Sequence, residues 1–381
     1  MKLPWKKGEA KSHSPVMVAL SQLGAARWGA RSSEALMRDG YLSNAVAYRC
    51  IRLVAEAAAS VPLETEHEGA GALVARPMPG EGCAELFCAL YATVQLTGNA
   101  YLEALTPEGA EEPKGLQVLR PDRMSADLDT RGWVNAWVYK LGQKSRPIGR
   151  RVDGWLPVLH LKQFHPGDDI YGFSPLAAAR QALDLHNAGA SWAKALIDNS
   201  AKPSGALVYG GDGARLTDEQ FDRLKAELEM AHTGIENAGR PLLLEGGLDW
   251  KPMSLSPAEM DFLAARNGAA REIALALGVP PQILGIPGDN TYANYKEANA
   301  ALWRMTIIPL VNRMASSLGG WFSECFNEDV RFRCNLDMVP ALSEERERLW
   351  SRLEAATFVS EEEKRALAGF PPRVTPGQDA G

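Results

Sequence analysis

The sequence has little cysteine and no long apolar segment. Its 381 residues include five cysteines, and none of them forms a CxxC pair, which argues against a zinc ribbon or a disulfide scaffold. We expect reduced, buried thiols in a cytoplasmic compartment. No run reaches the roughly 18 consecutive apolar residues of a membrane-spanning helix. Residues 1–7 are basic but no apolar stretch follows them, so no signal peptide is expected.

The common catalytic motifs are absent as well. The sequence contains no GxxxxGK[ST], HExxH or GxSxG, and no GxGxxG after a predicted strand. The best candidate for an enzymatic site is the segment HLKQFHPGDD, with His160, His165, Asp168 and Asp169. These side chains are of the right type to bind a divalent metal ion. Because His160 lies in a predicted buried strand and Pro-Gly-Asp-Asp is a typical turn sequence, the pattern favours a structural role.

Composition and charge indicate a folded protein with an acidic body. Hydrophobic residues make up 46% and charged residues 23% of the chain, and its length suggests two or three domains. The net charge is −6, although residues 1–52 carry nine basic and three acidic side chains. An acidic body does not fit a sequence-specific DNA reader, whose interface is usually basic. It remains compatible with a protein past which DNA slides.

The first half of the chain predicts an α+β fold. Residues 1–41 are expected to form a mobile arm with one short helix over residues 33–39, and the spacing of apolar residues predicts a helix over residues 44–60. Helical and alternating patterns then mix without regular βαβ order. A helix is predicted over residues 84–96 and strands over residues 100–105, 116–119, 133–141 and 158–161.

Two long helices with a module between them are predicted in the middle of the chain. The first opens at Ser174-Pro175 and runs to about Asn199, with apolar residues on several faces and one polar stripe. The second opens at Ser256 with Glu259 at the third position and ends at Gly278. Between them, residues 202–254 read as a small α/β insertion with strands over 205–209 and 241–245. This order describes a hairpin-shaped projection.

A loop and further helices complete the chain. A third helix is predicted from Tyr292 to Leu318, with a kink near Pro309 because proline lacks an amide hydrogen. A strand is expected over residues 331–338. Ser343 and Ser360 are expected to cap two final helices over residues 344–356 and 361–368.

The order of several short motifs resembles the portal proteins of tailed double-stranded DNA phages. The resemblance covers residues 42–372, and no single motif decides it. The motifs are CIRLVAE with VPL (residues 50–63), TGNAY (97–101), HLK (160–162), GFSPL (172–176), LEGG with Trp250 (244–250), GVPP (278–281), LG (284–285), TYAN (291–294) and the terminal segment 363–372.

The resemblance implies a portal fold with named regions. These are an N-terminal arm (1–41), an α+β wing (42–173), two stem helices (174–200 and 256–278), an α/β clip (201–255), a tunnel loop (279–291), a kinked tunnel helix with a return to the wing (292–341), and a short helical crown with a C-terminal tail (342–381). The predicted helix pair would be the stem, and the insertion between the two helices would be the clip.

The resemblance also implies a function. The family forms a ring of about twelve subunits at one capsid vertex, through which double-stranded DNA is packaged and ejected without sequence specificity. Its implied partners are the major capsid protein, the large terminase subunit and a head-tail adaptor, with no catalysis, cofactor or membrane contact. The protein would lie in a virion or phage-like particle assembled in the bacterial cytoplasm, encoded by a phage, a prophage or a gene transfer agent.

Candidate residues follow from this assignment. Stem packing is expected at Ala182, Ala193, Leu196, Ala264 and Ile273. Clip contacts are expected at Asp218, Glu219, Asp222 and Glu227, which give one helix an acidic face. DNA is expected to pass the tunnel loop at Ile286, Gly288, Asp289 and Asn290, with Lys296 as the nearest cation and Glu297 beside it. Two other functions remain open: a metal-dependent hydrolase built on the His160 cluster, and a soluble α-helical adaptor with no DNA role.

Overall fold

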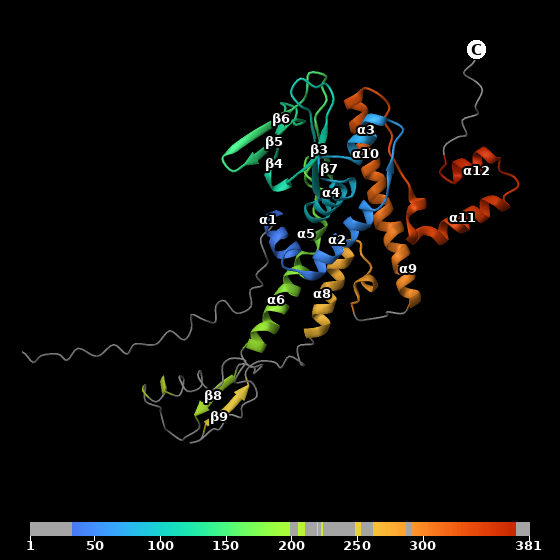
Figure 1. Ribbon diagram of the computed structural model, residues 1–381. Coiled ribbons are helices and arrows are strands. Elements are labelled where there is room, and N and C mark those ends of the chain that lie inside the picture. The colour runs from blue at the N-terminus through green and yellow to red at the C-terminus, as the bar shows by residue number, and fades with distance from the viewer. Residues whose placement is uncertain are drawn as a thin grey trace, which may run out of the picture.

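The computed structural model describes residues 33–198, 205–209, 219, 222–223, 248–252, 262–286 and 292–370. A central body of helices and sheet carries three projections (Figure 1). A pair of helices, α6 and α8, descends from the body; a three-stranded sheet lies at one side; and α11 and α12 extend to the other side. None of the described helices is long and apolar enough to cross a membrane.

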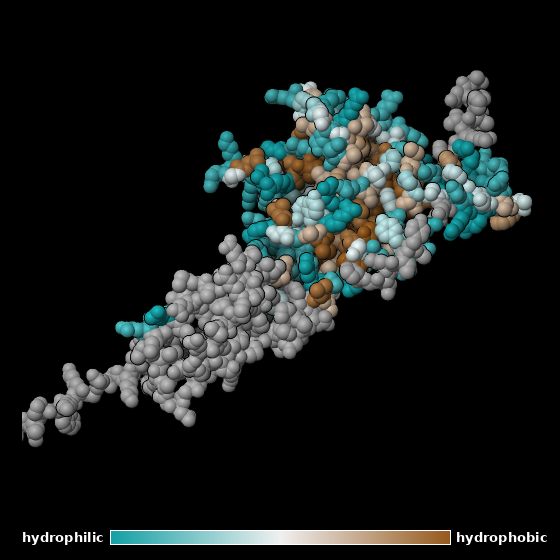
Figure 2. Space-filling model, turned by 60° about the horizontal axis from the view of Figure 1, so that its bottom comes forward, coloured by the Kyte–Doolittle hydropathy of each residue, from teal (hydrophilic) through white to brown (hydrophobic). Residues whose placement is uncertain are grey.

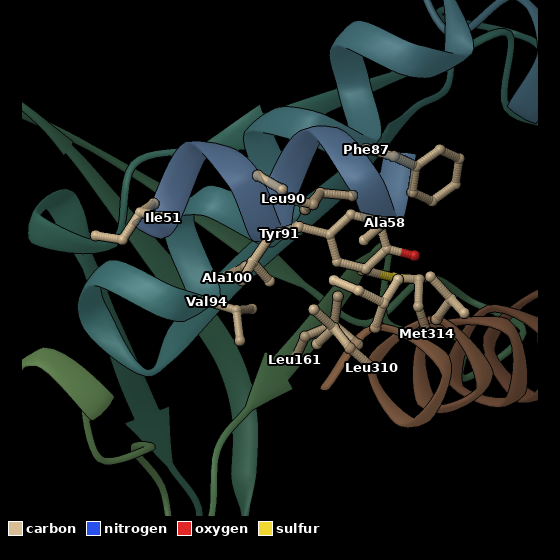
Figure 3. Close-up of a cluster of buried hydrophobic side chains, with 14 of the residues drawn as sticks. Ile51, Ala58, Phe87, Leu90, Tyr91, Val94, Ala100, Leu161, Leu310 and Met314 are labelled. Atoms are coloured by element: carbon tan, nitrogen blue, oxygen red, sulfur yellow. The ribbon is translucent and has the colours of Figure 1, made fainter. Parts of the chain in front are cut away.

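The core of the body is built on helices α2 (Ala45–Ala59), α4 (Cys83–Thr97) and α10 (Ile308–Phe326). Asn44 caps α2, since its side chain accepts hydrogen bonds from the amides of Val46 and Ala47. The predicted helices over 44–60 and 84–96 are therefore confirmed. Figure 3 shows Ile51 and Ala58 of α2, Leu90 and Val94 of α4, and Leu310 and Met314 of α10 in one buried cluster.

Two antiparallel sheets adjoin this core. In the first, β2 (Asn99–Leu105) lies between β3 (Gly115–Leu119) and β7 (Val158–Lys162). The second contains β4 (Met124–Leu128), β5 (Val134–Leu141) and β6 (Lys144–Gly149). Trp137 of β5 and Ile148 of β6 pack on Tyr101 of β2 and so join the two sheets through a second small core. The strands predicted at 100–105, 116–119, 133–141 and 158–161 are confirmed.

Smaller elements complete the body. Helix α3 (Glu68–Ala75), the turn η3 (Pro121–Arg123) and strands β4 and β6 were not predicted. The strand expected over 331–338 is wrong in extent, because only β10 (Arg333–Cys334) pairs with β1 (Leu63–Glu64). Asn335 ends that pairing by capping the following 3₁₀ turn, η7 (Leu336–Met338).

The two long helices predicted in the middle of the chain are present in their described parts, and the first is interrupted. It consists of α5 (Pro175–Ala178) and α6 (Arg180–Asp198), separated at Ala179, whereas one continuous helix was predicted. At the break the helix leaves one of its partners: α5 packs on both α4 and α8 (Phe262–Ala276), whereas α6 packs on α8. The predicted stop at Gly278 is confirmed by its left-handed backbone (φ +69°), and the turn η5 (Pro281–Leu284) follows.

Between the stem helices, the structure describes an antiparallel pair formed by β8 (Gly205–Tyr209) and β9 (Leu248–Pro252). The first of these strands was predicted. The second strand predicted in this insertion, over 241–245, lies outside the described residues, as does the predicted start of the second stem helix at Ser256.

The third long helix departs from regular α-helical geometry just before Pro309, near which a kink was predicted. Helix α9 (Tyr292–Leu302) leads into a π-helical turn, η6 (Trp303–Ile307), and then into α10. Pro309 supplies no amide hydrogen, and in the widened turn before it the Ile308 amide bonds to the Trp303 carbonyl. The helix continues past the predicted end at Leu318 to Phe326. Gly319 lies against the backbone of Val330, where a β-carbon would be 2.9 Å from the carbonyl oxygen, so this glycine serves close packing and does not end the helix.

The ends of the described chain are helical. Helix α1 (Ser33–Leu36) and the π turn η2 (Met37–Tyr41) replace the short helix predicted over 33–39. At the other end, η8 (Pro340–Leu342) leads into α11 (Ser343–Ala355) and α12 (Glu361–Leu367). Ser360 caps α12 as predicted, but Ser343 does not cap α11, because its hydroxyl donates to the Pro340 carbonyl instead.

Candidate assembly and channel surfaces

The residues predicted for stem packing divide between buried and exposed positions. Ala182 and Ile273 lie inside the core formed by α6, α8 and the body. Ala193 is half-buried and Ala264 is exposed, while the side chain of Leu196 lies outside the described set. The structure therefore brings Ala182 and Ile273 together within one chain and leaves Ala264 facing outward.

The polar stripe of α6 holds the preceding part of the chain. Asn187 donates to the Asp39 carbonyl (2.7 Å), and the Asn44 side-chain amide donates to Asn187 (2.8 Å) and to Nδ1 of His186 (3.0 Å). Burial lowers the pKa of His186, which keeps Nδ1 available as an acceptor. These contacts fasten the start of α2 to the stem.

Large apolar side chains are exposed on helices α6 and α8. Leu185 of α6 is 52% exposed, and Leu263 and Leu275 of α8 are 72% and 78% exposed. Met305, in the π turn η6, is also exposed. Figure 2 shows hydrophobic areas interrupting the hydrophilic surface of the body. These side chains are candidates for contact with another protein surface. The sequence did not single out these residues, although the apolar faces of the stem helices were the available signal.

The predicted channel residues are only partly described. Ile286 is half-buried after η5, and Lys296 and Glu297 are both exposed on α9. Gly288, Asp289 and Asn290 lie outside the described residues. The structure thus places a cation and an anion side by side on the helix that follows the predicted tunnel loop.

The predicted clip contacts are described at two positions. Glu219 and Asp222 are helical and exposed, as an acidic helix face requires. Asp218 and Glu227 lie outside the described residues.

The His160 cluster is used for structure. The His160 ring stacks on Tyr101 with centroids 4.5 Å apart, and Nε2 lies 3.0 Å from Oδ1 of Asn99. His165 Nδ1 accepts from the Gly167 amide, and Asp168 accepts from the amides of Ile170 and Tyr171. Asp169 lines the same hollow as His160 and Trp133, and its backbone carbonyl accepts from Lys162. Within the described residues, no three His, Cys, Asp or Glu side chains gather as a metal site.

His160 makes the fold sensitive to acid. Burial lowers its pKa to about 3, against about 6.5 in an unfolded chain, so the unfolded state binds more protons between these values. The contribution of this residue to stability is therefore complete above pH 6.5 and falls below it, by up to about 1.4 kcal/mol per pH unit. We expect urea unfolding of His160→Gln to depend less on pH than that of the unmodified chain. Equal dependence in both proteins would contradict this.

Comparisons with known proteins place the chain in a family. It is 47% identical to a chain in the neck of an empty gene transfer agent (GTA) particle, with a TM-score of 0.70 over 93% of this chain and 98% of that chain. It is 49% identical to a chain of the native GTA neck computed with C12 symmetry, with a TM-score of 0.69 over 92% and 97% of the two chains. A probable portal protein of Streptomyces phage phiC31 is 25% identical and is covered over 82% of its length, with 96% of this chain.

The profile of the family described as "Phage portal protein" matches residues 45–369. The chain is a member of the phage portal protein family. This confirms the resemblance noted in the sequence over nearly the same span, and the α+β portal fold with it. Portal proteins are structural components and not enzymes, so the hypothesis of a hydrolase at His160, His165, Asp168 and Asp169 is wrong. The fold instead uses the side chains of His160, His165 and Asp168 to fix the end of β7 and the turn after it.

Proposed function

We propose that this portal protein forms a ring of about twelve subunits at one capsid vertex, through which DNA enters and leaves the particle. The observation that carries the proposal is the set of exposed leucines on the stem, Leu185, Leu263 and Leu275. Covering these side chains with another protein surface is favourable, and a face that meets a different face of an identical neighbour generates a ring when the rotation between neighbours closes. The neck structures of the similar GTA chains were computed with C6 and with C12 symmetry, and a ring of twelve subunits fits both.

The charge of the chain suits a channel through which DNA moves. A net charge of −6 repels phosphate, so DNA passing the ring is not held by the counterion release that drives non-specific binding. We infer that contact with double-stranded DNA is transient and independent of sequence. No cofactor or membrane enters this function.

Regions and partners follow the family order. We infer a wing at 42–173, a stem at 174–200 and 256–278, a clip at 201–255, a tunnel loop at 279–291, a tunnel helix at 292–341 and a crown at 342–381, after an N-terminal arm at 1–41. The wing would meet the major capsid protein. We infer that the protein is part of a phage or gene transfer agent particle, and that this particle assembles in the bacterial cytoplasm.

Electron microscopy of the purified protein tests the ring directly. Negatively stained particles should be annular with a central hole, and native mass spectrometry should give a mass of about twelve subunits. A compact monomer at all accessible concentrations would contradict the proposal and would favour a helical adaptor.

The clip is proposed as the docking surface for the large terminase subunit and, later, the head-tail adaptor. Glu219 and Asp222 expose carboxylates there, which fits partners with a basic face. Deletion of residues 210–239 should leave capsids that form but stay empty, because the packaging motor has lost its contact. The measurement is nuclease-protected DNA in purified particles, and particles filled as in the wild type would contradict the role of the clip.

The tunnel loop is proposed as the narrowest point of the channel. Lys296 is the nearest described cation able to touch phosphate on the following helix, and the adjacent Glu297 limits how strongly it binds. Shortening residues 286–290 should allow packaging but reduce retention of the packaged DNA. Retention equal to that of the wild type in a nuclease-protection assay would leave this segment as a simple connector.

A further inference from the structure

The arm formed by α11 and α12 has almost no core of its own. Figure 1 shows the two helices extending from the body, and Ala368 is the buried residue among the described side chains of residues 343–370. Phe358, in the connection between the helices, is 90% exposed, and Leu367 is 60% exposed. Short helices draw their stability from burial of an apolar face. The exposed side chains of this arm therefore require a covering surface.

The base of the arm is fastened to the body. Arg346 forms an ion pair with Asp337, and its guanidinium also donates to the Ala368 carbonyl (2.9 Å) at the end of α12. Trp350 lies under the Arg346 guanidinium, 5.8 Å from the ring centroid. These contacts fix the direction of the arm, so its outer part is presented at a constant position in each subunit.

Opposite charges lie at different places on the outer part of the arm. Arg352 on α11 is exposed, and its Nε donates only to the Arg348 carbonyl at 3.3 Å. Glu362 on α12 is exposed, while its neighbours Glu361 and Glu363 are engaged by Lys364 and by the cap at Ser360. Within the described part of the chain, neither Arg352 nor Glu362 has a partner of opposite charge. A hollow of about 670 Å³ surrounds Arg352 and is lined by Glu347, Arg348 and Ser351.

We propose that the arms of adjacent subunits pack head to tail, with Glu362 of one copy against Arg352 of the next. The occupant of the hollow on α11 is thus a second copy of this chain. Phe358 and Leu367 are covered by the same contact. This inference rests on the proposed ring and adds to it a contact outside the stem.

Charge complementarity within one chain favours a second copy over an unrelated partner. A partner whose contact surface carries only one sign of charge would form an ion pair with Glu362 or with Arg352, but not with both. An identical neighbour satisfies both when two different faces meet, and repetition of that contact around an axis uses every face once. An exposed ion pair is weak by itself, but it recurs at each interface of the ring.

Single charge reversals test the contact. Glu362→Arg and Arg352→Glu each place like charges opposite one another at every interface, so each should raise the protein concentration at half-assembly about threefold or more. Glu108→Arg makes the same change in net charge as Glu362→Arg at an exposed loop position on the wing, and it should leave assembly unchanged. Circular dichroism should show that all three variants remain folded.

Mixing the two arm variants provides the decisive measurement. In an equal mixture, rings that alternate the variants place the introduced arginine of one against the introduced glutamate of the other at one interface. At the next interface, the native Glu362 meets the native Arg352, so opposite charges face each other throughout the ring. Native mass spectrometry should therefore show rings of alternating composition at the wild-type concentration.

The outcomes separate the arm contact from the ring itself. If the wild type forms a ring and neither reversal raises the concentration at half-assembly, the proposed arm contact is wrong and the proposed ring is unaffected. The same conclusion follows if the mixture of variants assembles no better than each variant alone. If the wild type forms no ring, the proposed function itself fails.

Discussion

Leu275→Asp is expected to abolish ring assembly and to leave the subunit folded. The Leu275 side chain is 78% exposed on α8, so a carboxylate there stays in water in the isolated chain. In a ring, the same carboxylate would be buried without a partner, and its desolvation would weaken each interface by several kcal/mol. Native mass spectrometry should show monomers, and circular dichroism and the urea midpoint should match those of the unmodified protein.

Ile273→Asp, two residues earlier on the same helix, is the matched control. Ile273 is fully buried in the core of the chain, so the carboxylate would be trapped inside the subunit itself. This variant should be unfolded or strongly destabilised, by about 3 kcal/mol or more. Intact rings of Leu275→Asp, or a folded and stable Ile273→Asp, would show that the exposed and buried faces of the stem have been misassigned.

Gly172→Ala is expected to prevent stable folding of the wing. A β-carbon at this position would lie 2.1 Å from the Gly98 carbonyl oxygen and 2.7 Å from the Gln163 amide nitrogen. Both groups are backbone, and they are already hydrogen-bonded to each other at 2.8 Å, so neither can move aside. The variant should lose about 3 kcal/mol or more in the free energy of unfolding, measured in urea.

Gly167→Ala makes the same chemical change five residues earlier in the chain. There the nearest atom to an added β-carbon is Cε1 of the His165 ring at 3.6 Å, an ordinary contact. Its effect on the free energy of unfolding should stay within about 0.5 kcal/mol. A small effect at Gly172 would mean that β7 and the turn before the stem separate more readily than their hydrogen bonds indicate.

Helix caps made much of this fold predictable. Ser174 and Ser360 were each predicted as caps, and each caps its helix in the structure; Asn44, at the start of a predicted helix, also caps it. The signals are local, because one side chain bonds amides two or three residues away. Ser343 carried the same pattern and failed, since the turn η8 before it already supplied a carbonyl for its hydroxyl.

Elements whose stability comes from distant partners were missed. Helix α3 contains Gly69 and Gly71, which lower its helical propensity, and the imidazole of His67 caps it in place of an ordinary capping residue. Strand β6 contains Pro147, which is tolerated because β6 lies at the edge of its sheet. Propensity alone cannot identify such segments, because their neighbours in the fold decide their structure.

The candidate contact surface was predictable only in outline. The sequence showed that the first of the two long helices carries apolar residues on several faces, which implies more than one neighbour. It could not show that Ile273 faces the chain's own core while Leu275 faces outward, because the packing of α8 against α6 and α2 sets that rotation. The same limit applies to Ala182, which was predicted as a stem contact and is enclosed by its own subunit.

The π turn at residues 303–307 sets how the side chains before it are rotated around the helix axis relative to those after it. One additional residue in a helical turn rotates everything before it by about 100° relative to everything after it. Ala298 and Leu302 face the core on one side of this turn, as Leu310 and Val311 do on the other. The number of residues in the turn therefore decides in which direction Lys296 points around the helix axis, relative to the residues of α10. Deletion of a single residue from this turn would restore regular α-helical geometry and rotate Lys296 by about 100° around the helix axis. A substitution in the turn would leave the direction of Lys296 unchanged.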